Sequence, residues 1–125
     1  MNIQFPIFIL AKDDLSINMI SDSRQLSRWY EEIDVKNNEY SGWDSNGYSL
    51  TVLWNSNIGT TVEIADETSQ MDKLREAIFN YAKLRRPKIP FAYPDPKNIV
   101  ELFKAAQIHI KKGNFIQKIK RLFTV

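Results

Sequence analysis

The chain has 125 residues, of which 43% are hydrophobic and 26% are charged, and its formal net charge is +2. This length suits one domain that buries a core without help from a metal ion or a disulfide bond. The lack of cysteine excludes a disulfide framework, a thiolate-ligated metal site and thiol catalysis, and the single histidine excludes any site that needs two imidazoles from one chain.

The first part of the chain predicts two strands and a helix. Residues 3–11 are mostly apolar and predict a strand whose start, near Pro6, lies at a sheet edge or a bulge, and residues 16–20 predict a short returning strand. Asp22 followed by Gln25 has the spacing of a capping box and predicts the start of a helix. Apolar residues then recur at helical spacing and predict one buried face made of Leu26, Trp29, Tyr30 and Ile33.

A meander of three strands is predicted next. The pair Asn46-Gly47 lies between two aromatic runs, and both residue types tolerate positive φ, so the pair indicates a hairpin turn. This turn joins a strand at 39–43 to a strand at 48–55. A second turn leads to alternating apolar residues at 58–64, which predict the last strand.

Helices are predicted for the remainder of the chain. Apolar residues at helical spacing predict a long helix over residues 67–86. The proline-rich residues 87–96 predict a connector without regular structure. Asp95 predicts the start of a further helix that ends at Gly113, and residues 114–123 predict a last short helix.

The order of these elements, β-β-α-β-β-β-α-α-α, predicts an α+β fold with an antiparallel sheet of about five strands and helices packed mainly on one face. Residues 1–125 are expected to form a single domain. The first apolar run lacks the basic start of a secretory signal and is shorter than the roughly 20 residues of a membrane helix. Together with the lack of cysteine, this favours a cytoplasmic protein without a membrane span.

Residue types that carry catalysis or bind cofactors are sparse. His109 has no carboxylate near it in the sequence to orient it as a general base. The loop Asp44–Gly47 lacks the spacing of a calcium-binding loop, and the four glycines form no phosphate-binding fingerprint. The sequence therefore favours a non-enzymatic protein with no catalytic residue, metal or cofactor. A small enzyme with a carboxylate- or tyrosine-based site is a further alternative.

Two aromatic features are open to more than one interpretation. Alternation along the predicted strand 48–55 places Tyr48 and Trp54 on one face, which is core if helices cover it and a recognition patch if it is open. Residues 85–93 mix cations with aromatic side chains, which is typical of proteins that bind single-stranded nucleic acid and also compatible with an exposed connector.

Charge is divided unevenly between the two parts of the chain. Residues 1–70 hold four basic and eleven acidic side chains, a net charge of −7, whereas residues 71–125 hold thirteen basic and four acidic ones, a net charge of +9. A division of this size indicates a charged partner, or two halves that attract each other.

The acidic part favours a protein-binding module, such as an immunity or antitoxin protein that binds a basic target. The predicted protein-binding residues are Asp13, Asp14, Glu31, Glu32 and Asp34. The basic part favours the alternative, a nucleic-acid-binding protein. The residues predicted for that role are Arg85, Arg86, Lys88, Lys111, Lys112, Lys118, Lys120 and Arg121.

The segment from Ile33 to Gly47 carries the pattern Ile-Asp-Val, Glu-Tyr and Trp-Asp-x-x-Gly, and it follows the sequences Pro-Ile-Phe-Ile and Lys-Asp-Asp. With these motifs the chain, as far as about residue 55, resembles a family of small bacterial proteins of unknown function. The resemblance implies a bacterial source and no particular activity. Many small single-domain bacterial proteins of this kind are immunity or antitoxin partners, an analogy that agrees with the protein-binding prediction.

Overall fold

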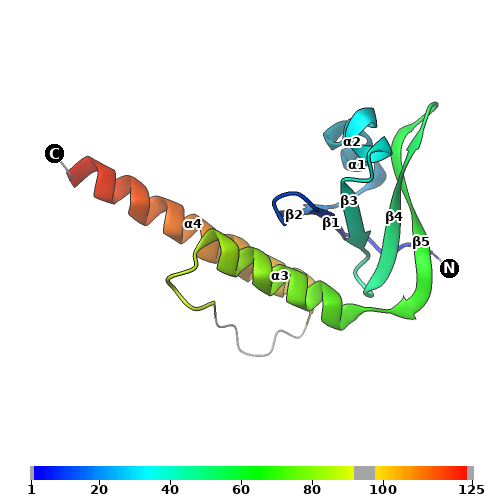
Figure 1. Cartoon of the computed structure of the whole chain (residues 1–125). Coiled ribbons are helices and arrows are strands. Elements are labelled where there is room, and N and C mark those ends of the chain that lie inside the picture. Colours follow the sequence, from blue (N-terminus) through cyan, green and yellow to red (C-terminus); the bar gives the residue numbers. More distant parts are fainter. Residues whose placement is uncertain (1, 92–97, 124–125) are drawn as a thin grey trace. The chain divides into compact units, whose positions relative to one another are not determined.

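The computed structural model describes residues 2–91 and 98–123, with side chains described as far as residue 112. Its five-stranded antiparallel sheet and its helices confirm the predicted α+β fold. The chain divides into two compact units, residues 1–74 and residues 75–125. The first unit contains the sheet, two short helices and residues 71–74, the first turn of the helix α3 (Met71–Arg85), and the second unit is helical (Figure 1).

The sheet has the strand order β2-β1-β3-β4-β5, and every neighbouring pair is antiparallel (Figure 1). The strands span Ile7–Ala11 (β1), Ile17–Ile20 (β2), Tyr40–Trp43 (β3), Tyr48–Asn55 (β4) and Gly59–Ser69 (β5). The bounds predicted for β4 are confirmed. β1 starts later than predicted, because Gln4 O accepts a hydrogen bond from Ser45 N in the β3–β4 turn, at 3.0 Å, instead of joining a ladder.

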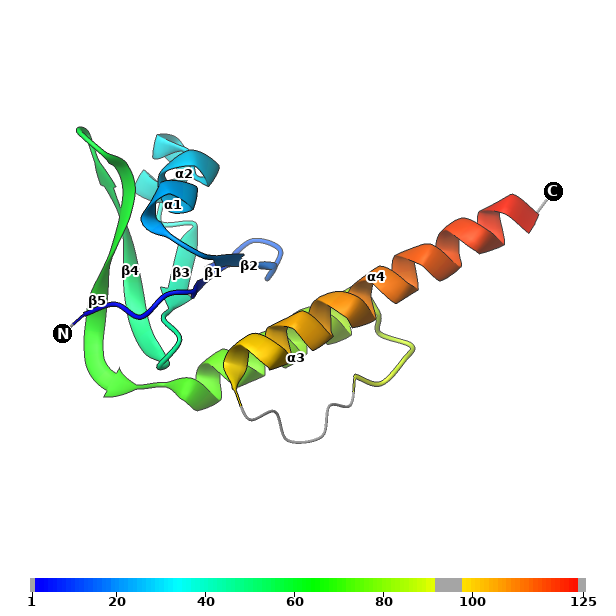
Figure 2. The same cartoon turned by 180° about the vertical axis from the view of Figure 1, so that it is seen from behind.

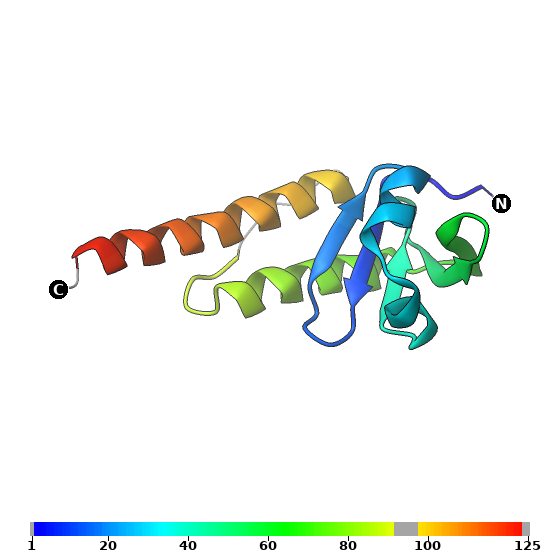
Figure 3. The same cartoon turned by 90° about the horizontal axis from the view of Figure 1, so that it is seen from above.

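The core of the first unit lies between the sheet and the helices α1 (Ser23–Trp29) and α2 (Glu32–Lys36) (Figure 3). α1 contacts β2 and β5, and α2 contacts β4 and β5. Each fully buried aliphatic side chain here contributes roughly 1.5–3 kcal/mol. Trp54 packs against this core, so the face of β4 that carries it belongs to the interior. The buried core residues are Ile7, Ile9, Ile20, Leu26, Tyr30, Val35 and Leu50.

The helix predicted after Asp22 ends too early to bury the whole predicted apolar face. The chain leaves the helical conformation at Tyr30, whose backbone is extended, and α2 begins at Glu32. The Thr60 hydroxyl donates a hydrogen bond to Tyr30 O at 3.2 Å in the buried interior, so a tertiary contact replaces continuation of the helix. Of the four predicted residues, Leu26 and Tyr30 are buried, whereas Trp29 and Ile33 are 54% and 64% exposed.

The boundary between β5 and the next helix also differs from the prediction. The sequence predicts a strand to residue 64 and a helix from residue 67, but β5 continues to Ser69 and α3 spans Met71–Arg85. The Ser69 hydroxyl donates to Asn46 O, and Gln70 N donates to Gly47 O, both at 2.7 Å. These hydrogen bonds to the β3–β4 turn hold the segment extended against its local helix preference.

The second unit pairs α3 with α4 (Ile99–Phe123), and the two helices run side by side in the same direction (Figure 2; Figure 3). The rings of Tyr81 and Phe103 stack between them, with centroids 6.5 Å apart. Neither helix, in the part of the chain that the structure describes, is long and apolar enough to cross a membrane.

α4 is continuous through Gly113, so the predicted end there and the separate last helix are wrong. A glycine inside a helix costs only about 1 kcal/mol relative to alanine, and helix-forming residues flank this one. The Asn98 side chain accepts a hydrogen bond from Glu101 N at 2.8 Å and caps the start of α4. The predicted start at Asp95 lies outside the described residues.

The predicted connector, residues 87–96, is described as far as Phe91 and contains no helix or strand over that range. The Phe91 ring lies 5.3 Å from the Phe79 ring and 5.2 Å from the His109 ring, measured between centroids. The start of the connector therefore packs against both helices of the second unit.

Candidate functional site

Three carboxylates from separate elements of the first unit form an acidic surface: Asp13, Asp34 and Glu39. Asp13 lies in the β1–β2 turn, Asp34 lies in α2, and Glu39 directly precedes β3. Backbone hydrogen bonds fix these positions. Lys12 N donates to Glu39 O at 2.9 Å, and Glu39 N donates to Asp34 O at 3.2 Å. The fold thus brings together two of the predicted protein-binding residues and adds Glu39, which the sequence analysis did not identify.

Glu39 holds its proton more tightly than an ordinary glutamate. The pKa of Glu39 is raised above its ordinary value, first by a side-chain hydrogen bond with Asp34, then by desolvation, and then by the charges of Asp34 and Asp13. Among the described residues, no lysine or arginine forms an ion pair with Asp34 or Glu39. The acidic surface is therefore a site of uncompensated negative charge.

Tyr40 supports the same surface from β3. Its hydroxyl donates to Asp34 Oδ2 at 3.5 Å, and its ring meets the Tyr30 ring edge to face, with centroids 4.7 Å apart. Burial, followed by the Asp34 charge, raises the pKa of Tyr40 to about 12. At neutral pH this phenol stays protonated, and it acts as a hydrogen-bond donor to Asp34.

Replacing Asp34 by asparagine is expected to lower the pKa of Glu39 to its ordinary value or below. The amide carries no charge, and it can donate a hydrogen bond to the Glu39 carboxylate. The pKa of Tyr40 should fall by less, because burial is its first cause. Carbon-13 NMR titration of the Glu39 carboxyl group measures the change, with Glu32→Gln as the control, and an unchanged Glu39 pKa would contradict the assignment.

The other predicted acidic residues have different surroundings. Asp14 belongs to the β1–β2 turn, where its Oδ1 accepts from Ser16 N at 3.0 Å. Glu31 and Glu32 lie at the start of α2. Glu32 forms an ion pair with Lys36 at 2.7 Å, so part of its charge is already balanced. Of the five predicted residues, only Asp13 and Asp34 therefore belong to the acidic surface.

The residues predicted to bind nucleic acid lie in the second unit. Arg85 and Arg86 lie at the end of α3, and Arg86 Nη1 donates to His109 O on α4 at 3.3 Å. Lys112 and Arg86 both act on the His109 imidazole electrostatically, so cations from both helices meet at this point. Lys88 and Lys111 are exposed, and each lies two residues along the sequence from Arg86 and His109, respectively. The side chains of Lys118, Lys120 and Arg121 lie outside the described residues.

His109 is a half-buried imidazole at this junction of α3 and α4. Its Nε2 is buried and has no hydrogen-bond partner among the described residues. Desolvation, followed by the Arg86 charge, lowers its pKa below the ordinary value of 6.5, and Lys112 acts in the same direction. The neutral form is therefore the one that the fold favours.

Stability of the second unit is expected to decrease as the pH falls below about 6.5, where the unfolded chain binds a proton at His109 more readily than the folded chain. This contribution is fully present above that pH. When the pH is lowered from 7.5 to 5.5, the melting temperature of the His109→Gln variant should fall by less than that of the natural chain. Glu39 acts in the opposite direction, so the comparison of the two proteins isolates the histidine.

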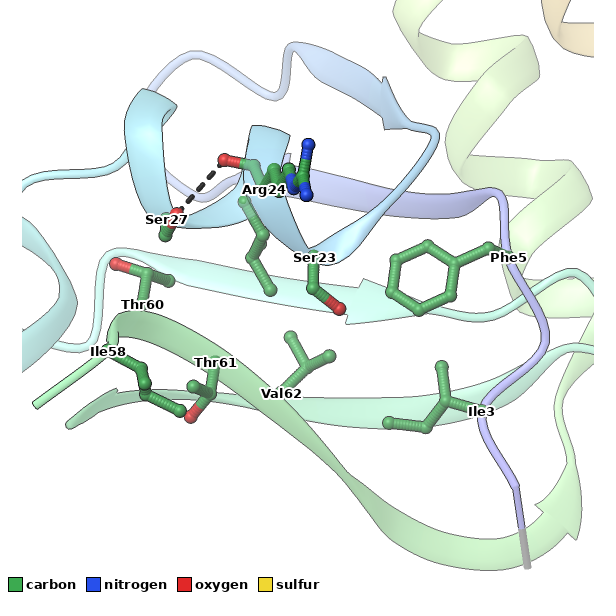
Figure 4. A pocket seen from close by; sticks show the side chains of 10 residues that line it. Ile3, Phe5, Ser23, Arg24, Ser27, Ile58, Thr60, Thr61 and Val62 are labelled. Carbon is green, nitrogen blue, oxygen red and sulfur yellow. Dashed lines mark hydrogen bonds between the residues drawn. The ribbon is translucent and has the colours of Figure 1, made fainter.

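The first unit contains a pocket whose lining does not include Asp13, Asp34 or Glu39 (Figure 4). It has a volume of about 350 Å³ and lies between the N-terminal segment, α1 and the start of β5. Its walls are largely apolar, and Arg24 is its one charged residue. Nothing in the sequence predicts it, because its walls come from three segments that are distant along the chain. The walls include Ile3, Phe5, Leu26, Ile58 and Val62.

No cluster of three or more histidine or acidic side chains that could hold a metal ion occurs among residues 2–91 and 98–112. Comparison with known proteins gives no family model, no curated protein and no solved structure that matches the chain.

Proposed function

We propose that this protein is a protein-binding module of the immunity or antitoxin type, which presents the acidic surface to a basic target protein. The observation that supports this proposal is the convergence of Asp13, Asp34 and Glu39, none of which forms an ion pair with a lysine or arginine in the part of the chain that the structure describes. Like charges held together raise the free energy of the folded protein. A partner that supplies lysine or arginine side chains relieves this repulsion on binding, and the complementary charge speeds encounter and sets specificity.

Affinity capture with the immobilised full-length chain tests this proposal. The bait is compared with the triple variant Asp13→Lys, Asp34→Lys, Glu39→Lys. A matched control changes three exposed helical carboxylates, Asp72→Lys, Glu76→Lys and Glu101→Lys, and therefore shifts the net charge by the same amount.

We expect at least one basic protein to bind the natural chain and the control variant, and to be lost on the acidic-surface variant. Its association rate should fall as salt is raised. If no captured protein shows this pattern, or if both triple variants lose binding equally, the acidic surface is not the binding site.

A second candidate function, binding of single-stranded nucleic acid, is favoured by the meeting of Arg86 and Lys112 beside the Phe91 and His109 rings. Cations next to aromatic rings can contact phosphates and stack bases. Fluorescence anisotropy with a labelled single-stranded DNA tests it. The double variant Lys88→Gln, Lys111→Gln should reduce the slope of log affinity against log salt by about 1.4, since each phosphate contact contributes about 0.7. A natural chain that shows no salt-dependent binding would exclude this function.

A further inference from the structure

β5 forms one edge of the sheet, and it is eleven residues long. One side of β5 pairs with β4 over residues 59–64, and an edge strand presents unpaired backbone N–H and C=O groups on its other side. The register shifts between the pairs Leu50–Ile64 and Tyr48–Ser69, so the strand bulges after residue 64. The regular part of the edge, residues 59–64, is thus a short template for an added strand.

The pocket adjoins this same part of β5, since Thr60, Thr61 and Val62 line it (Figure 4). Ile58, at the end of the β4–β5 turn, is 62% exposed at its margin. A strand added to β5 at this point would place a side chain beside apolar walls. The volume of about 350 Å³ is large enough for an aliphatic side chain together with its terminal group.

The wall formed by the N-terminal segment is held in place. Gln4 N donates to Asp44 Oδ2 at 3.1 Å, and Ser45 N donates to Gln4 O at 3.0 Å. The Ser45 hydroxyl also donates to Pro6 O at 2.6 Å. Because these bonds fix the residues on either side of Phe5, the pocket is preformed, and an occupant does not have to order its wall.

Arg24 gives the pocket a specific charge preference. It lies on α1, and its side chain extends along the upper rim of the pocket in Figure 4. It forms no ion pair with a carboxylate among the described residues, and the nearby Asp22 instead accepts the hydrogen bond from Gln25 N that caps α1. An unpaired guanidinium beside apolar walls matches an apolar group that carries a carboxylate.

Negative charge, opposite to that of Arg24, lies further along β5. Glu63, Asp66 and Glu67 are exposed on β5. Asp66 and Glu67 lie at most roughly 13–17 Å beyond Val62, at about 3.3 Å per residue, because the bulge after residue 64 shortens this part of the strand. The edge of β5 therefore combines an apolar pocket with a cation at its start and carboxylates at its far end.

We propose that the first unit binds the carboxyl-terminal tail of a partner protein as an added antiparallel strand on β5, with an apolar last residue in the pocket, its terminal carboxylate on Arg24, and basic side chains on Asp66 and Glu67. The proposal rests on the proposed function only in that the occupant belongs to a protein, and it uses a surface separate from the acidic surface. The tail runs antiparallel to β5 because its end lies at the start of that strand. Its basic residues lie four and five positions before its last residue, which corresponds to the spacing from Val62 to Asp66 and Glu67.

The test uses the 125-residue chain and a fluorescein-labelled peptide, Thr-Ser-Arg-Lys-Thr-Ser-Thr-Val, in about 0.15 M salt, where long-range charge effects are screened. Fluorescence anisotropy is expected to show saturable binding of the free acid. Amidation of the C-terminus and the Arg24→Gln variant should each weaken binding about tenfold, which is typical of a lost charge-assisted hydrogen bond. Together they should weaken it by little more than either alone, because they remove the same contact.

Three controls separate this proposal from a loss of folding and from the proposed function. Arg28→Gln changes the other exposed arginine of α1, which does not line the pocket, and should leave the affinity within about twofold. The triple variant of the acidic surface should also keep the affinity. Ile58→Glu should weaken binding while its melting temperature stays close to that of the natural chain, because Ile58 is exposed.

Peptides methylated on alternate backbone nitrogens test strand addition directly, since only one alternating set of amides pairs with β5. Equal binding of both methylated sets, or of the free acid and the amide, would overturn the proposal. Arg24-dependent binding of octanoate without competition by the peptide would assign the pocket to a small apolar carboxylate instead. Self-association of the chain that blocks the peptide would assign the edge to a second copy.

Discussion

Replacing Asp44 by alanine is expected to destabilise the protein by about 3–5 kcal/mol, a large part of the total stability of a small domain. Asp44 is fully buried. Its Oδ1 accepts hydrogen bonds from Asn46 N at 2.9 Å and Tyr48 N at 3.0 Å. Its Oδ2 accepts from Gln4 N at 3.1 Å. The alanine variant leaves three backbone donors in part-buried positions without this acceptor, and each lost hydrogen bond costs about 1–1.5 kcal/mol.

Urea denaturation followed by circular dichroism measures this effect, and Asp44→Asn provides a graded comparison. The asparagine keeps an oxygen for Asn46 and Tyr48 but turns an amide nitrogen toward Gln4 N. Its decrease in the free energy of unfolding should therefore lie between zero and that of the alanine variant. Asp22→Asn is the exposed control, because Asp22 accepts one capping bond and asparagine caps a helix equally well. Equal stability of the alanine and asparagine variants would show that the bonds to Asn46 and Tyr48 contribute nothing.

Asp44 also connects the β3–β4 turn to the wall of the pocket. Its bond to Gln4 is one of three that fix the N-terminal segment, and Asn loses only this bond. The Asp44→Asn variant should therefore bind the peptide tail more weakly while the sheet stays folded. This links the stability of the turn to the preformed state of the pocket.

Local signals in the sequence are sufficient for the elements whose contacts are local. The helix cap is confirmed, because Asp22 Oδ1 accepts from Gln25 N at 3.0 Å, while Gln25 Oε1 accepts from Ser21 N at 2.6 Å instead of the Asp22 N–H of a regular capping box. The Asn46-Gly47 turn is confirmed as well, and Gly47 has a φ of 83°. The hydrogen bonds that define both motifs join residues at most four positions apart, so a local sequence signal is enough to predict them.

The features that the sequence does not predict depend on contacts between distant segments. The end of α1 depends on Thr60, and the late start of α3 depends on the β3–β4 turn. The candidate sites follow the same rule. Asp13 joins Asp34 and Glu39 only because β1 and β3 pair, and Arg24 meets apolar walls only because the N-terminal segment crosses near β5. Charge counts indicate a charged partner, but they do not place the charges in space.

Replacing Gly47 by alanine is expected to cost about 3 kcal/mol or more, because two independent effects add. Its positive φ disfavours any residue with a Cβ by roughly 1–2 kcal/mol. A Cβ at this position would also lie 2.7 Å from Met71 N and 2.8 Å from Met71 Cα, so backbone at the start of α3 would have to move. The hydrogen bond from Gln70 N to Gly47 O at 2.7 Å makes that movement costly.

Gly59→Ala is the matched control for this prediction, since Gly59 has a similar φ of 87° but a Cβ there would first meet Ser27 Cβ at 3.3 Å. A movement of Ser27 on α1 by a few tenths of an ångström relieves this contact, so the control should lose little beyond the roughly 1–2 kcal/mol of the backbone conformation. Urea denaturation of both variants gives the difference, which isolates the clash with Met71. If the two variants are equally destabilised, the close approach of the β3–β4 turn to α3 does not constrain Gly47. A larger loss at Gly47 would show that this turn has to be glycine for two reasons, its own conformation and the helix start that packs on it.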